Sequence, residues 1–478
     1  MLKKLIILMI FFCVSLPVFG QSVDTAWVRR YNGVENGDDE ASALAVDGIG
    51  NILVTGNKGT IKYDSAGNLL WTGSWGGIDI AIDNSGNTFV TGVCTDSGTY
   101  DYSTIKYYPN GDTAWVRRYH NTPPGLNGVD VATCITVDAS GNVYVSGTSS
   151  EVSGAWFRMN YATLKYDSNG NMLWVSRYTP YEVKTADPTD LAVDDSGNVY
   201  VTGTVGNYPY TCYTTIKYNP QGKQLWRNTY NSPDYLNDRS SVIAVDGSHN
   251  VYVTGSTGTI KYDADGKQLW VGLWVGSDMR MDDLGNIYLA GGISGDFATI
   301  KYYPNGDTGW VRKYNGPGDV NDGANAMAMD CFRNIYVTGY SGNWPNDDYA
   351  TIKYDSNGNQ LWVQRYNGPA NYWDQPSDIT VDFSGNIYVT GKSAQNSVSP
   401  YNFDYLTIKY VQFLRGDVNY DRQVVVADIV YLVSYLFKHG PAPNPLMSGD
   451  ANCDGKVTIS DIVYLVAYLF KHGPQPCS

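Results

Sequence analysis

Short runs of alternating hydrophobic and polar residues fill the chain from residue 25 to residue 410. The runs are rich in β-branched and aromatic residues, and clusters of Gly, Asn and Asp separate them. Alternation with a period of two, bounded by turn residues, predicts β-strands that bury one face. No run in this range follows the period of an amphipathic helix. The pattern therefore predicts an all-β domain built from many short strands.

These strands group into a unit that recurs eight times. One unit reads Trp and a short strand, a variable loop, "AxAVD", "xSGN", "VYVTG", a second variable loop, "TIKY", and "DSNGNxL" before the next Trp. The unit-opening tryptophans are Trp27, Trp71, Trp115, Trp174, Trp226, Trp270, Trp310 and Trp362. The "VD" strands end at Asp47, Asp83, Asp138, Asp194, Asp246, Asp282, Asp330 and Asp382. Four-stranded units repeated eight times predict an eight-bladed β-propeller, with seven blades as the alternative.

The two ends of the repeat indicate how the ring closes. The first unit opens with a lone strand at residues 25–31, and the last unit ends at its "TIKY" with no Trp strand after it. We therefore expect the N-terminal strand to form the outermost strand of the last blade. This closure joins the first blade to the last and protects the strand edges.

The repeats "VDASGNVYVSG", "VDDSGNVYVTG" and "VDFSGNIYVTG" resemble the bacterial SBBP-type β-propeller repeat, whose hallmark is "DxxGNxYVTG". The resemblance covers most of residues 25–410 and implies a β-propeller. The stretch "YDADGKQLW" (262–270) is similar to the tryptophan-docking motif of quinoprotein-type eight-bladed propellers. That likeness implies tryptophans packed between blades.

The repeated aspartates favour a structural role over a metal site or a glycosidase site. Asp and Asn cap tight turns with local hydrogen bonds, and Gly supplies positive φ. A residue present in every unit serves the folding of the unit, whereas catalysis needs residues that break the repeat. His120 and His249, the two histidines of the propeller, sit in no motif and are expected at the surface. A carboxylate pair at the centre of the ring stays open as an alternative.

Loop lengths differ between the two faces of the predicted disc. The turns "VDxSGN" and "DSNGN" are short and uniform, whereas the other two connections of each unit vary in length and share one face. Surface loops on a rigid scaffold commonly carry binding sites. The irregular aromatic residues of these loops are our candidates for ligand binding, because aromatic rings among amides and carboxylates suit sugars or protein partners. They are Trp156, Phe157, Tyr208, Tyr210, Trp344, Trp373, Tyr401 and Phe403. The tyrosines at a fixed offset before "TIKY" (Tyr102, Tyr161, Tyr213, Tyr349 and Tyr405) are expected to pack in the core instead.

After residue 414 the composition changes, and an apolar segment appears twice as "DIVYLVSYLFKHGP" and "DIVYLVAYLFKHGP". Each copy follows an acidic loop, "DVNYDRQVVVAD" (417–428) or "DANCDGKVTISD" (450–461). Oxygen ligands at positions 1, 3, 5 and 12 and a backbone carbonyl at position 7 describe an EF-hand-like calcium loop. The first loop offers Asp417, Asn419, Asp421, the carbonyl of Gln423, and Asp428. The second offers Asp450, Asn452, Asp454, the carbonyl of Lys456, and Asp461. We expect two calcium ions.

The duplicated loop and helix resemble a type I dockerin over residues 416–478. The resemblance implies two calcium ions and binding to a cohesin module, as in complexes that degrade polysaccharides. Three features depart from the pattern. Arg422 replaces the Gly of position 6, which predicts a weaker first site, and Val425 offers no side-chain oxygen at position 9. Residues at positions 10 and 11, which often choose the cohesin, are not the small hydroxyl pair in either loop.

Each loop predicts a helix that ends at "KHG", where Gly–Pro stops it. Ile429, Leu432, Val433 and Leu436 can face the partner helix. Tyr431, Tyr435 and Phe437 exceed one buried stripe, which leaves two uses open, a partner-binding face or packing against the propeller. We expect the module beside the short-turn face, because the last strand of the propeller ends there.

The N-terminus predicts export from a bacterial cell. Lys3 and Lys4 precede the apolar run "LIILMIFFCVSLPVFG", which reads as a secretory signal peptide over residues 1–20 and is too short to favour a membrane span. The formal charge of −14, without a basic patch, argues against nucleic acid. Disulfides are permitted outside the cell, and Cys453 with Cys477 is the best candidate pair. We therefore divide the chain into a signal peptide (1–20), a propeller (21–414) and a dockerin-like domain (415–478).

These features predict a secreted, non-enzymatic binding or scaffold protein. In this hypothesis the propeller loops recognise a carbohydrate or protein ligand, and the calcium-dependent module attaches to a cohesin-like partner. The alternative hypothesis is a carbohydrate hydrolase or lyase with its site in the propeller. It needs acidic residues that break the repeat and converge in a pocket.

Overall fold

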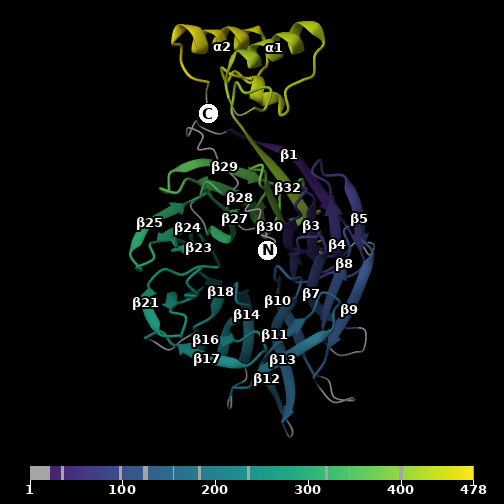
Figure 1. The fold of residues 1–478 in the computed structure, drawn as a ribbon. Coiled ribbons are helices and arrows are strands. Elements are labelled where there is room, and N and C mark those ends of the chain that lie inside the picture. Colours follow the sequence, from purple (N-terminus) through teal and green to yellow (C-terminus); the bar gives the residue numbers. More distant parts are fainter. Residues whose placement is uncertain are drawn as a thin grey trace, which may run out of the picture.

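The computed structural model describes residues 22–33, 37–95, 100–121, 128–153, 156–180, 183, 185–233, 237–317, 321–343, 345–397, 402–421 and 423–476. Figure 1 shows a ring of β-sheets and, beyond the ends of β1 (Ser22–Tyr31) and β32 (Phe403–Phe413), a small helical part. The expected signal peptide, residues 1–20, lies outside the described residues.

Eight antiparallel sheets of four strands form the ring, so the described residues confirm an eight-bladed β-propeller and not a seven-bladed one. The innermost strands are β2 (Ala41–Val46), β6 (Asp79–Ile82), β10 (Asp130–Val137), β14 (Thr185–Val193), β18 (Ser240–Val245), β22 (Asp278–Met281), β26 (Gly323–Met329) and β30 (Asp374–Val381). The second strands are β3 (Ile52–Gly56), β7 (Thr88–Cys94), β11 (Val143–Ser153), β15 (Val199–Asn207), β19 (Val251–Gly255), β23 (Ile287–Ile293), β27 (Ile335–Asn343) and β31 (Ile387–Ala394). The third strands are β4 (Gly59–Tyr63), β8 (Asp101–Tyr107), β12 (Trp156–Tyr166), β16 (Tyr210–Tyr218), β20 (Thr259–Tyr262), β24 (Asp296–Tyr302), β28 (Asn346–Tyr354) and β32. The outermost strands are β1, β5 (Leu69–Gly73), β9 (Thr113–Tyr119), β13 (Met172–Tyr178), β17 (Gln224–Tyr230), β21 (Gln268–Gly272), β25 (Thr308–Tyr314) and β29 (Gln360–Tyr366).

The ring closes through the N-terminal strand, as predicted. The last blade has the strand order β1-β32-β31-β30, so its outermost strand comes from the start of the chain. Strand β1 pairs antiparallel with β32 from Ser22 opposite Phe413 to Tyr31 opposite Tyr405. Opening the ring therefore requires breaking a full strand pair between the two ends of the propeller sequence.

The repeated aspartates hold the turns between the first and second strands. In the third blade, Asp138 Oδ1 accepts hydrogen bonds from the backbone N–H groups of Ser140 (2.9 Å) and Asn142 (2.9 Å). Its Oδ2 accepts from Asn142 Nδ2 (2.7 Å) and from the hydroxyl of Tyr144 (2.9 Å). Equivalent bonds surround Asp83, Asp194 and Asp382. The predicted structural role of these carboxylates is confirmed.

A tryptophan on the outermost strand of one blade docks on the next blade. Trp115 of the second blade donates its Nε1–H to the carbonyl of Ser168 (3.3 Å), which lies between β12 and β13 of the third blade. Its ring lies between Phe89 and Tyr166, with ring centroids 6.0 and 6.2 Å apart. Such aromatic pairs add about 0.5–1.5 kcal/mol beyond burial. The same indole bond recurs around the ring, which confirms that the tryptophans pack between blades.

The docking site of the eighth tryptophan is built differently, because the chain leaves the last blade after β32 and makes no turn there. The side chain of Gln412 replaces the missing turn carbonyl, since its Oε1 accepts from Trp362 Nε1 (3.5 Å) and from the ammonium group of Lys353. Its Nε2 donates to Tyr336 Oη (3.0 Å) and to the carbonyl of Gly385 (2.6 Å). Gln412 thus restores the link between the seventh and eighth blades.

The core of the propeller lies between the blades, and it includes the tyrosines that precede "TIKY". Their exposure is 1 % or less at Tyr102, Tyr161, Tyr213, Tyr349 and Tyr405. The prediction that these rings pack in the core is confirmed.

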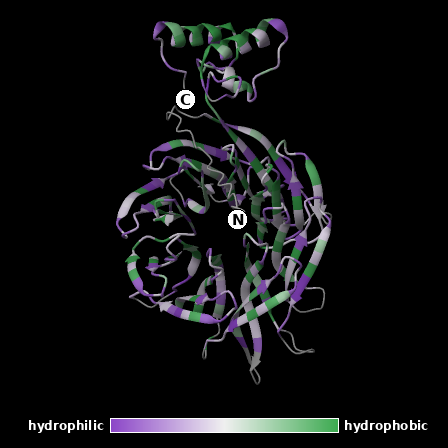
Figure 2. Ribbon diagram, viewed as in Figure 1, coloured by the Kyte–Doolittle hydropathy of each residue, from purple (hydrophilic) through white to green (hydrophobic). Residues whose placement is uncertain are grey.

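The C-terminal part contains helices α1 (Val426–Lys438) and α2 (Ile459–Lys471) and a 3-10 turn at Leu446–Gly449. Its core is a small cluster around Leu432 and Leu465, both fully buried, with Val418 and Ala451 from the two acidic loops. Figure 2 shows both helices as largely hydrophobic along their length. This surplus of apolar residues agrees with the sequence pattern.

The ends of the two helices differ in detail from the sequence prediction. The residue in the left-handed conformation is His439 (φ 56°) or His472 (φ 53°), and not the Gly that follows each. Gly440 is required for a different reason, because a Cβ there would lie 2.4 Å from Ser434 Oγ. Glycine therefore permits close packing of the chain against the last helical turn.

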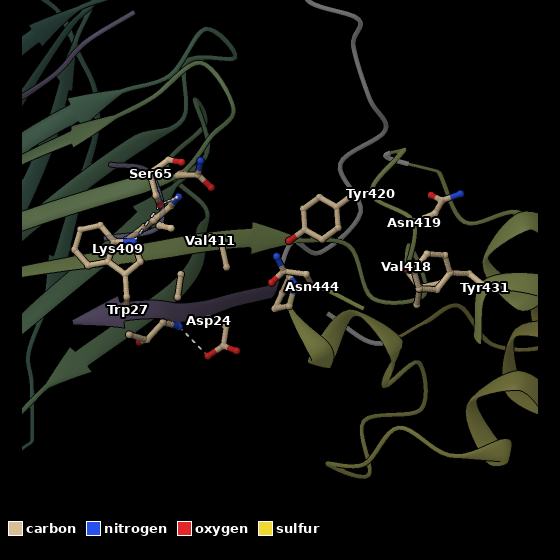
Figure 3. A pocket seen from close by; sticks show the side chains of 15 residues that line it. Asp24, Trp27, Ser65, Lys409, Val411, Val418, Asn419, Tyr420, Tyr431 and Asn444 are labelled. Atoms are coloured by element: carbon tan, nitrogen blue, oxygen red, sulfur yellow. Dashed lines mark hydrogen bonds between the residues drawn. The ribbon is translucent and has the colours of Figure 1, made fainter. Parts of the chain in front are cut away.

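The helical module lies beside the short-turn face of the propeller, as predicted. A cleft between the two parts is lined by Ser65 and Ala66 of a short turn, by Asn386 of another, and by Tyr420 and Asn444 of the module. Figure 3 shows that the module approaches the ends of β1 and β32 from this side.

Candidate calcium loops and the faces of the propeller

The first acidic loop gathers its predicted ligands around a turn. The backbone N–H of Asp421 donates to Asp417 Oδ1 (3.1 Å) and to Asn419 Oδ1 (3.0 Å), and Asn419 Nδ2 donates to Asp421 Oδ2 (2.9 Å). Asp428, on the first turn of α1, reaches back and accepts from the N–H groups of Val418 (2.9 Å) and Val425 (2.8 Å). The loop thereby brings the side chains of positions 1, 3, 5 and 12 together.

The second loop repeats this network at equivalent positions. The N–H of Asp454 donates to Asp450 Oδ1 (3.1 Å) and Asn452 Oδ1 (3.0 Å). Asp461 accepts from the N–H groups of Asn452 (3.3 Å) and Thr458 (2.8 Å). The N–H of Lys456, at position 7, donates to Asp454 Oδ1 (3.0 Å), as that of Gln423 does to Asp421 Oδ1 in the first loop (2.9 Å). The two loops are therefore structural copies, as their sequences predicted.

The electrostatics of both loops favour a bound cation. Asp428 and Asp461 are fully buried. Burial raises the pKa of both carboxyl groups, and the negative charges of Asp421 and Asp450, respectively, raise it further. Clustered carboxylate, amide and carbonyl oxygens are the donor set that a hard divalent cation such as Ca²⁺ requires. The residues present thus fit calcium.

One backbone feature of the loops was missed by the sequence reasoning. Position 4 adopts the left-handed conformation in both loops, at Tyr420 (φ 64°) and Cys453 (φ 59°), and neither is the Gly or Asn that signals such a turn. At position 6, Gly455 has φ 81°, whereas Arg422 lies outside the described residues. Cys453 is disulfide-bonded, and its expected partner, Cys477, also lies outside them.

Arg415 is a further residue that the motif did not reveal. Its Nη1 donates to Asp450 Oδ2 (2.9 Å) and to the Asp450 carbonyl (3.1 Å), and its Nε donates to Ser22 Oγ (3.1 Å). The guanidinium group also lies over the ring of Phe413, 5.7 Å from its centroid. Arg415 therefore connects the first ligand of the second loop to the first strand of the propeller.

The two helices present equivalent apolar side chains to solvent. Val430 and Val463 are both 62 % exposed, and Phe437 and Phe470 are 60 % and 62 % exposed. Tyr431 instead lines the cleft toward the propeller. Phe437 thus lies at the surface of the module, whereas Tyr431 lines the cleft toward the propeller.

The candidate ligand-binding residues of the propeller fall into three groups. Tyr208 and Tyr210 are 73 % and 67 % exposed at the tip of β15 and β16. Trp373 and Phe403 pack together, with centroids 6.3 Å apart, and Trp373 donates to Asp347 Oδ2 (3.0 Å). Side-chain positions of the remaining four lie outside the described set, namely Trp156, Phe157, Trp344 and Tyr401.

The cleft in Figure 3 has a volume of about 730 Å³. On the propeller side, Trp27 Nε1 and Lys409 Nζ both donate to the carbonyl of Ser65 (3.2 and 2.8 Å). On the module side, Tyr420 and Asn444 face it from the first loop and from the connection between the helices. The cleft therefore lies between the docking site of Trp27 on the propeller and the exposed side chains of Tyr420 and Asn444 on the module.

Alternate blades place an aspartate on the innermost strand four residues before the "VD" aspartate, a pattern that the sequence reasoning missed. These residues are Asp79, Asp190, Asp278 and Asp378. Each accepts the N–H of the next residue and the N–H of a residue in the following blade, as Asp79 does from Ile80 (2.8 Å) and Ile135 (2.8 Å). Through these hydrogen bonds, each of the four carboxylates joins its own blade to the following blade.

One cation, Arg280, interacts electrostatically with three of these carboxylates, those of Asp278, Asp378 and Asp190. Arg280 forms an ion pair with Asp278 (2.7 Å). Burial raises the pKa of Asp79 to about 6, that of Asp190 to about 7 and that of Asp378 to about 6, and the neighbouring carboxylates contribute to each rise. Negative charge is therefore concentrated around the axis of the ring.

Comparison with known proteins identifies both parts. The family model for a β-propeller repeat matches residues 182–209 and 361–396, and the model for a dockerin type I domain matches residues 415–470. An uncharacterized WD repeat-containing protein of Acanthamoeba polyphaga mimivirus is 25 % identical over 188 residues, which cover 36 % of this chain and 12 % of that protein. The chain thus spans about an eighth of the length of this curated relative.

Solved structures offer only distant likenesses. A protein of unknown function from Bacteroides caccae has a TM-score of 0.33 at 11 % identity, and the match covers 60 % of this chain and 97 % of that one. The extracellular domain of a putative one-component system from B. thetaiotaomicron has a TM-score of 0.38 at 13 % identity, covering 81 % and 40 %. With TM-scores below 0.5, these likenesses carry no weight for function.

Dockerin type I domains bind calcium and imply a cohesin partner, and such domains occur in extracellular proteins. Among the described residues, no helix has the length and apolar character needed to cross a bilayer. The chain thus contains β-propeller repeats and, at its C-terminal end, a dockerin type I domain.

Proposed function

We propose that this chain is a secreted, non-enzymatic scaffold protein that binds a ligand with its propeller and attaches to a cohesin-like partner through its dockerin domain. In this proposal residues 1–20 direct export, residues 21–414 form the ligand-binding propeller, and residues 415–478 form the attachment domain. Two calcium ions hold the attachment domain in its binding conformation, one in each acidic loop.

The observation that carries the proposal is the structural equivalence of the two loop–helix units. Each loop gathers its oxygen donors through the same hydrogen bonds. Each helix then leaves the same two apolar positions exposed, Val430 and Phe437 or Val463 and Phe470. Exposed apolar patches on a small, otherwise packed domain are typical of a protein-binding surface.

Calcium titration of the full-length chain by calorimetry tests the metal sites. We expect two binding events, with the weaker one at the first loop because Arg422 and Val425 depart from the motif. Asp428→Asn should remove one event and Asp461→Asn the other. Asp112→Asn, which changes an exposed turn residue of the propeller, is the matched control and should leave both. A chain that takes up no calcium would contradict the proposal.

Capture on immobilised type I cohesin modules tests the attachment. Binding should require calcium and disappear when EDTA is added. Because each helix offers an equivalent face, Phe437→Ala or Phe470→Ala alone should weaken capture, and the double variant should weaken it more than either. Failure of every cohesin module to retain the chain in calcium would argue for a partner of another kind.

The propeller ligand is proposed from the exposed tyrosines of the variable face. Tyr208 and Tyr210 leave most of their rings in solvent and lie away from the dockerin domain. We expect the full chain to bind a soluble polysaccharide or a protein ligand, and Tyr208→Ala with Tyr210→Ala to weaken that binding. Screening a polysaccharide panel for binding and for new reducing ends separates this proposal from the hydrolase or lyase alternative. Release of sugar would favour the enzyme.

A further inference from the structure

His120 departs from the repeat at a position where two blades meet. Five connections between an outermost strand and the next innermost strand share a Tyr followed by an amide or imidazole residue. The second residue of this pair is Asn32, Asn231, Asn315 and Asn367 in four of them, and His120 in the fifth. A single histidine among four asparagines is a residue that breaks the repeat, so it is a candidate for a local function.

The structure places His120 between two carboxylates that come from different blades. His120 Nδ1 lies 2.8 Å from Asp101 Oδ1 and 3.6 Å from Asp130 Oδ2. Asp101 begins β8 of the second blade, and Asp130 begins β10 of the third. One potential ligand atom from each residue lies within 4.8 Å of the other two. Among the described residues, this is the one cluster of three metal-binding side chains that meets this distance.

The backbone around the cluster is held in place before any ligand arrives. The N–H of Asp130 donates to the carbonyl of Tyr100 (2.8 Å), which joins the two blades beside the cluster. The N–H of Asn121 donates to Asp130 Oδ2 (3.0 Å), and Asn121 Nδ2 donates to the carbonyl of Ser150 (3.1 Å). The three side chains therefore come from fixed positions, which reduces the cost of arranging them around an ion.

The hydrogen bonds supplied by the described residues leave one carboxylate oxygen of Asp130 without a donor. Its side chain is fully buried, and its Oδ1 has no hydrogen-bond partner among the described residues. Nδ1 of an imidazole carries at most one hydrogen, so His120 cannot donate to Asp101 and Asp130 at once. A buried carboxylate that lacks compensation is costly, whereas a metal ion can bind both carboxylates and the ring nitrogen together.

The same arrangement elsewhere in the ring shows what His120 changes. At the joint between the last and first blades, Asp404 and Asp39 correspond to Asp101 and Asp130, and Arg30 faces Asp404 at 3.5 Å. At that joint Asp39 Oδ1 also has no hydrogen-bond partner among the described residues. An unsatisfied carboxylate oxygen is therefore a feature that both joints share. Only the joint with His120 adds an imidazole nitrogen to this oxygen set.

We propose that Asp101, His120 and Asp130 form a zinc site that links the second and third blades on the face of the variable loops. One imidazole nitrogen and two carboxylate oxygens are a ligand set that Zn²⁺ accepts, with a fourth position left for water or a ligand atom. Ca²⁺ prefers oxygen donors throughout and suits this site less well. The side chain of His120 is 34 % exposed, so an ion can enter from solvent. The site is independent of the dockerin domain.

Calorimetric titration of the full-length chain with Zn²⁺ tests the site, after metal has been stripped and the dockerin loops have been saturated with Ca²⁺. We expect one zinc event in the unchanged chain. His120→Asn should weaken it by about 10-fold or more, because even the outer partners of metal ligands are worth about 10-fold in affinity. This variant installs the residue that four other joints carry, so its melting temperature without zinc should be unchanged.

His249→Asn is the matched control, because His249 pairs with the single exposed carboxylate of Asp195 (2.9 Å) and should not contribute to zinc binding. Zinc should raise the melting temperature of the unchanged chain and of His249→Asn but not that of His120→Asn. Absence of a zinc event in the unchanged chain would overturn the proposal. An event that His120→Asn leaves intact would do the same, and would assign zinc to other surface histidines and His120 to the hydrogen-bonding role of the asparagines.

Discussion

Substitution of Gly170 by alanine tests whether tryptophan docking between blades stabilises the ring. Gly170 lies in the turn between β12 and β13 with φ +80°, and an added Cβ would lie 2.8 Å from Cδ2 of Trp115. Gly285, in a turn of the sixth blade, has a similar φ of +76°, but the nearest atom to its Cβ would be Cγ of Pro304 at 3.5 Å. Gly285→Ala therefore carries the same backbone strain without a tryptophan contact.

The expected losses follow from these two geometries. Left-handed backbone costs a non-glycine residue about 1–2 kcal/mol, and both variants bear this cost. Overpacking in a dense site costs about 1–3 kcal/mol, and Gly170→Ala bears this cost in addition. Trp115 cannot move away easily, because it is 9 % exposed and its indole is bonded to the next blade at 3.3 Å. We expect Gly285→Ala to lose about 1–2 kcal/mol and Gly170→Ala about 2–5 kcal/mol.

Denaturant unfolding of the propeller, followed by tryptophan fluorescence in excess calcium, measures both losses. A second comparison places Gly170→Ala in a chain that already carries Trp115→Leu. There the cost of the alanine should fall toward the cost measured at Gly285, because the clashing ring is gone and the remaining close contact, at 3.0 Å, is with the guanidinium group of Arg117. If the two alanine variants lose the same unfolding free energy in the unchanged background, the docking of tryptophans on these turns does not stabilise the ring.

Three further predictions concern the joint between the seventh and eighth blades, the aspartates around the axis of the ring, and the dockerin domain. Gln412→Ala removes the acceptor that faces Lys353 and Trp362, so calorimetry should show a loss of about 2–3 kcal/mol. Gln412→Glu should keep this acceptor but lose the bonds that Nε2 donates to Tyr336 and to the carbonyl of Gly385, so it should recover only part of the loss. The folded-state pKa values of about 6 for Asp79, about 7 for Asp190 and about 6 for Asp378 lie above the ordinary 3.8, so their contribution to stability is complete below about pH 4 and is lost as pH rises through about 6–7. Melting curves across this range should show the decline, and Asp190→Asn should flatten it; a decline of unchanged slope would contradict the assignment. Chelation of calcium should lower the stability of the dockerin domain by about 2.7 kcal/mol for each loop, relative to calcium at 100 times the Kd of that loop. The propeller transition should stay in place, as separate calorimetric peaks would reveal.

Much of the fold was predictable because each blade repeats the same local signals. Turn residues such as Asp138 act on neighbours within a few positions, so their role can be inferred from the motif alone. The lone N-terminal strand indicated how the ring closes, because the last unit lacks an outermost strand and the N-terminal strand can supply it. The two acidic loops could likewise be predicted from the sequence, because the proposed calcium ligands of each lie within twelve consecutive residues.

Residues that act between blades were harder to predict. Gln412 takes the place of a backbone carbonyl where the seventh blade meets the eighth, and no sequence signal marks a side chain in that role. Arg415 reaches Asp450 across the dockerin domain and Ser22 at the other end of the chain. Trp373 and Phe403, chosen as exposed candidates, pack against each other because the ends of two connections converge above the last blade.

The sequence alone determined the number of blades, the closure of the ring and the equivalence of the two acidic loops, because all of these depend on short-range patterns that recur. The tertiary structure decided which distant side chains meet. His120 appears in the sequence as an isolated surface histidine, and only the joint between two blades places it against Asp101 and Asp130. The physical reason is that local periodicity sets the strands, whereas the juxtaposition of groups far apart in the chain depends on how whole blades pack.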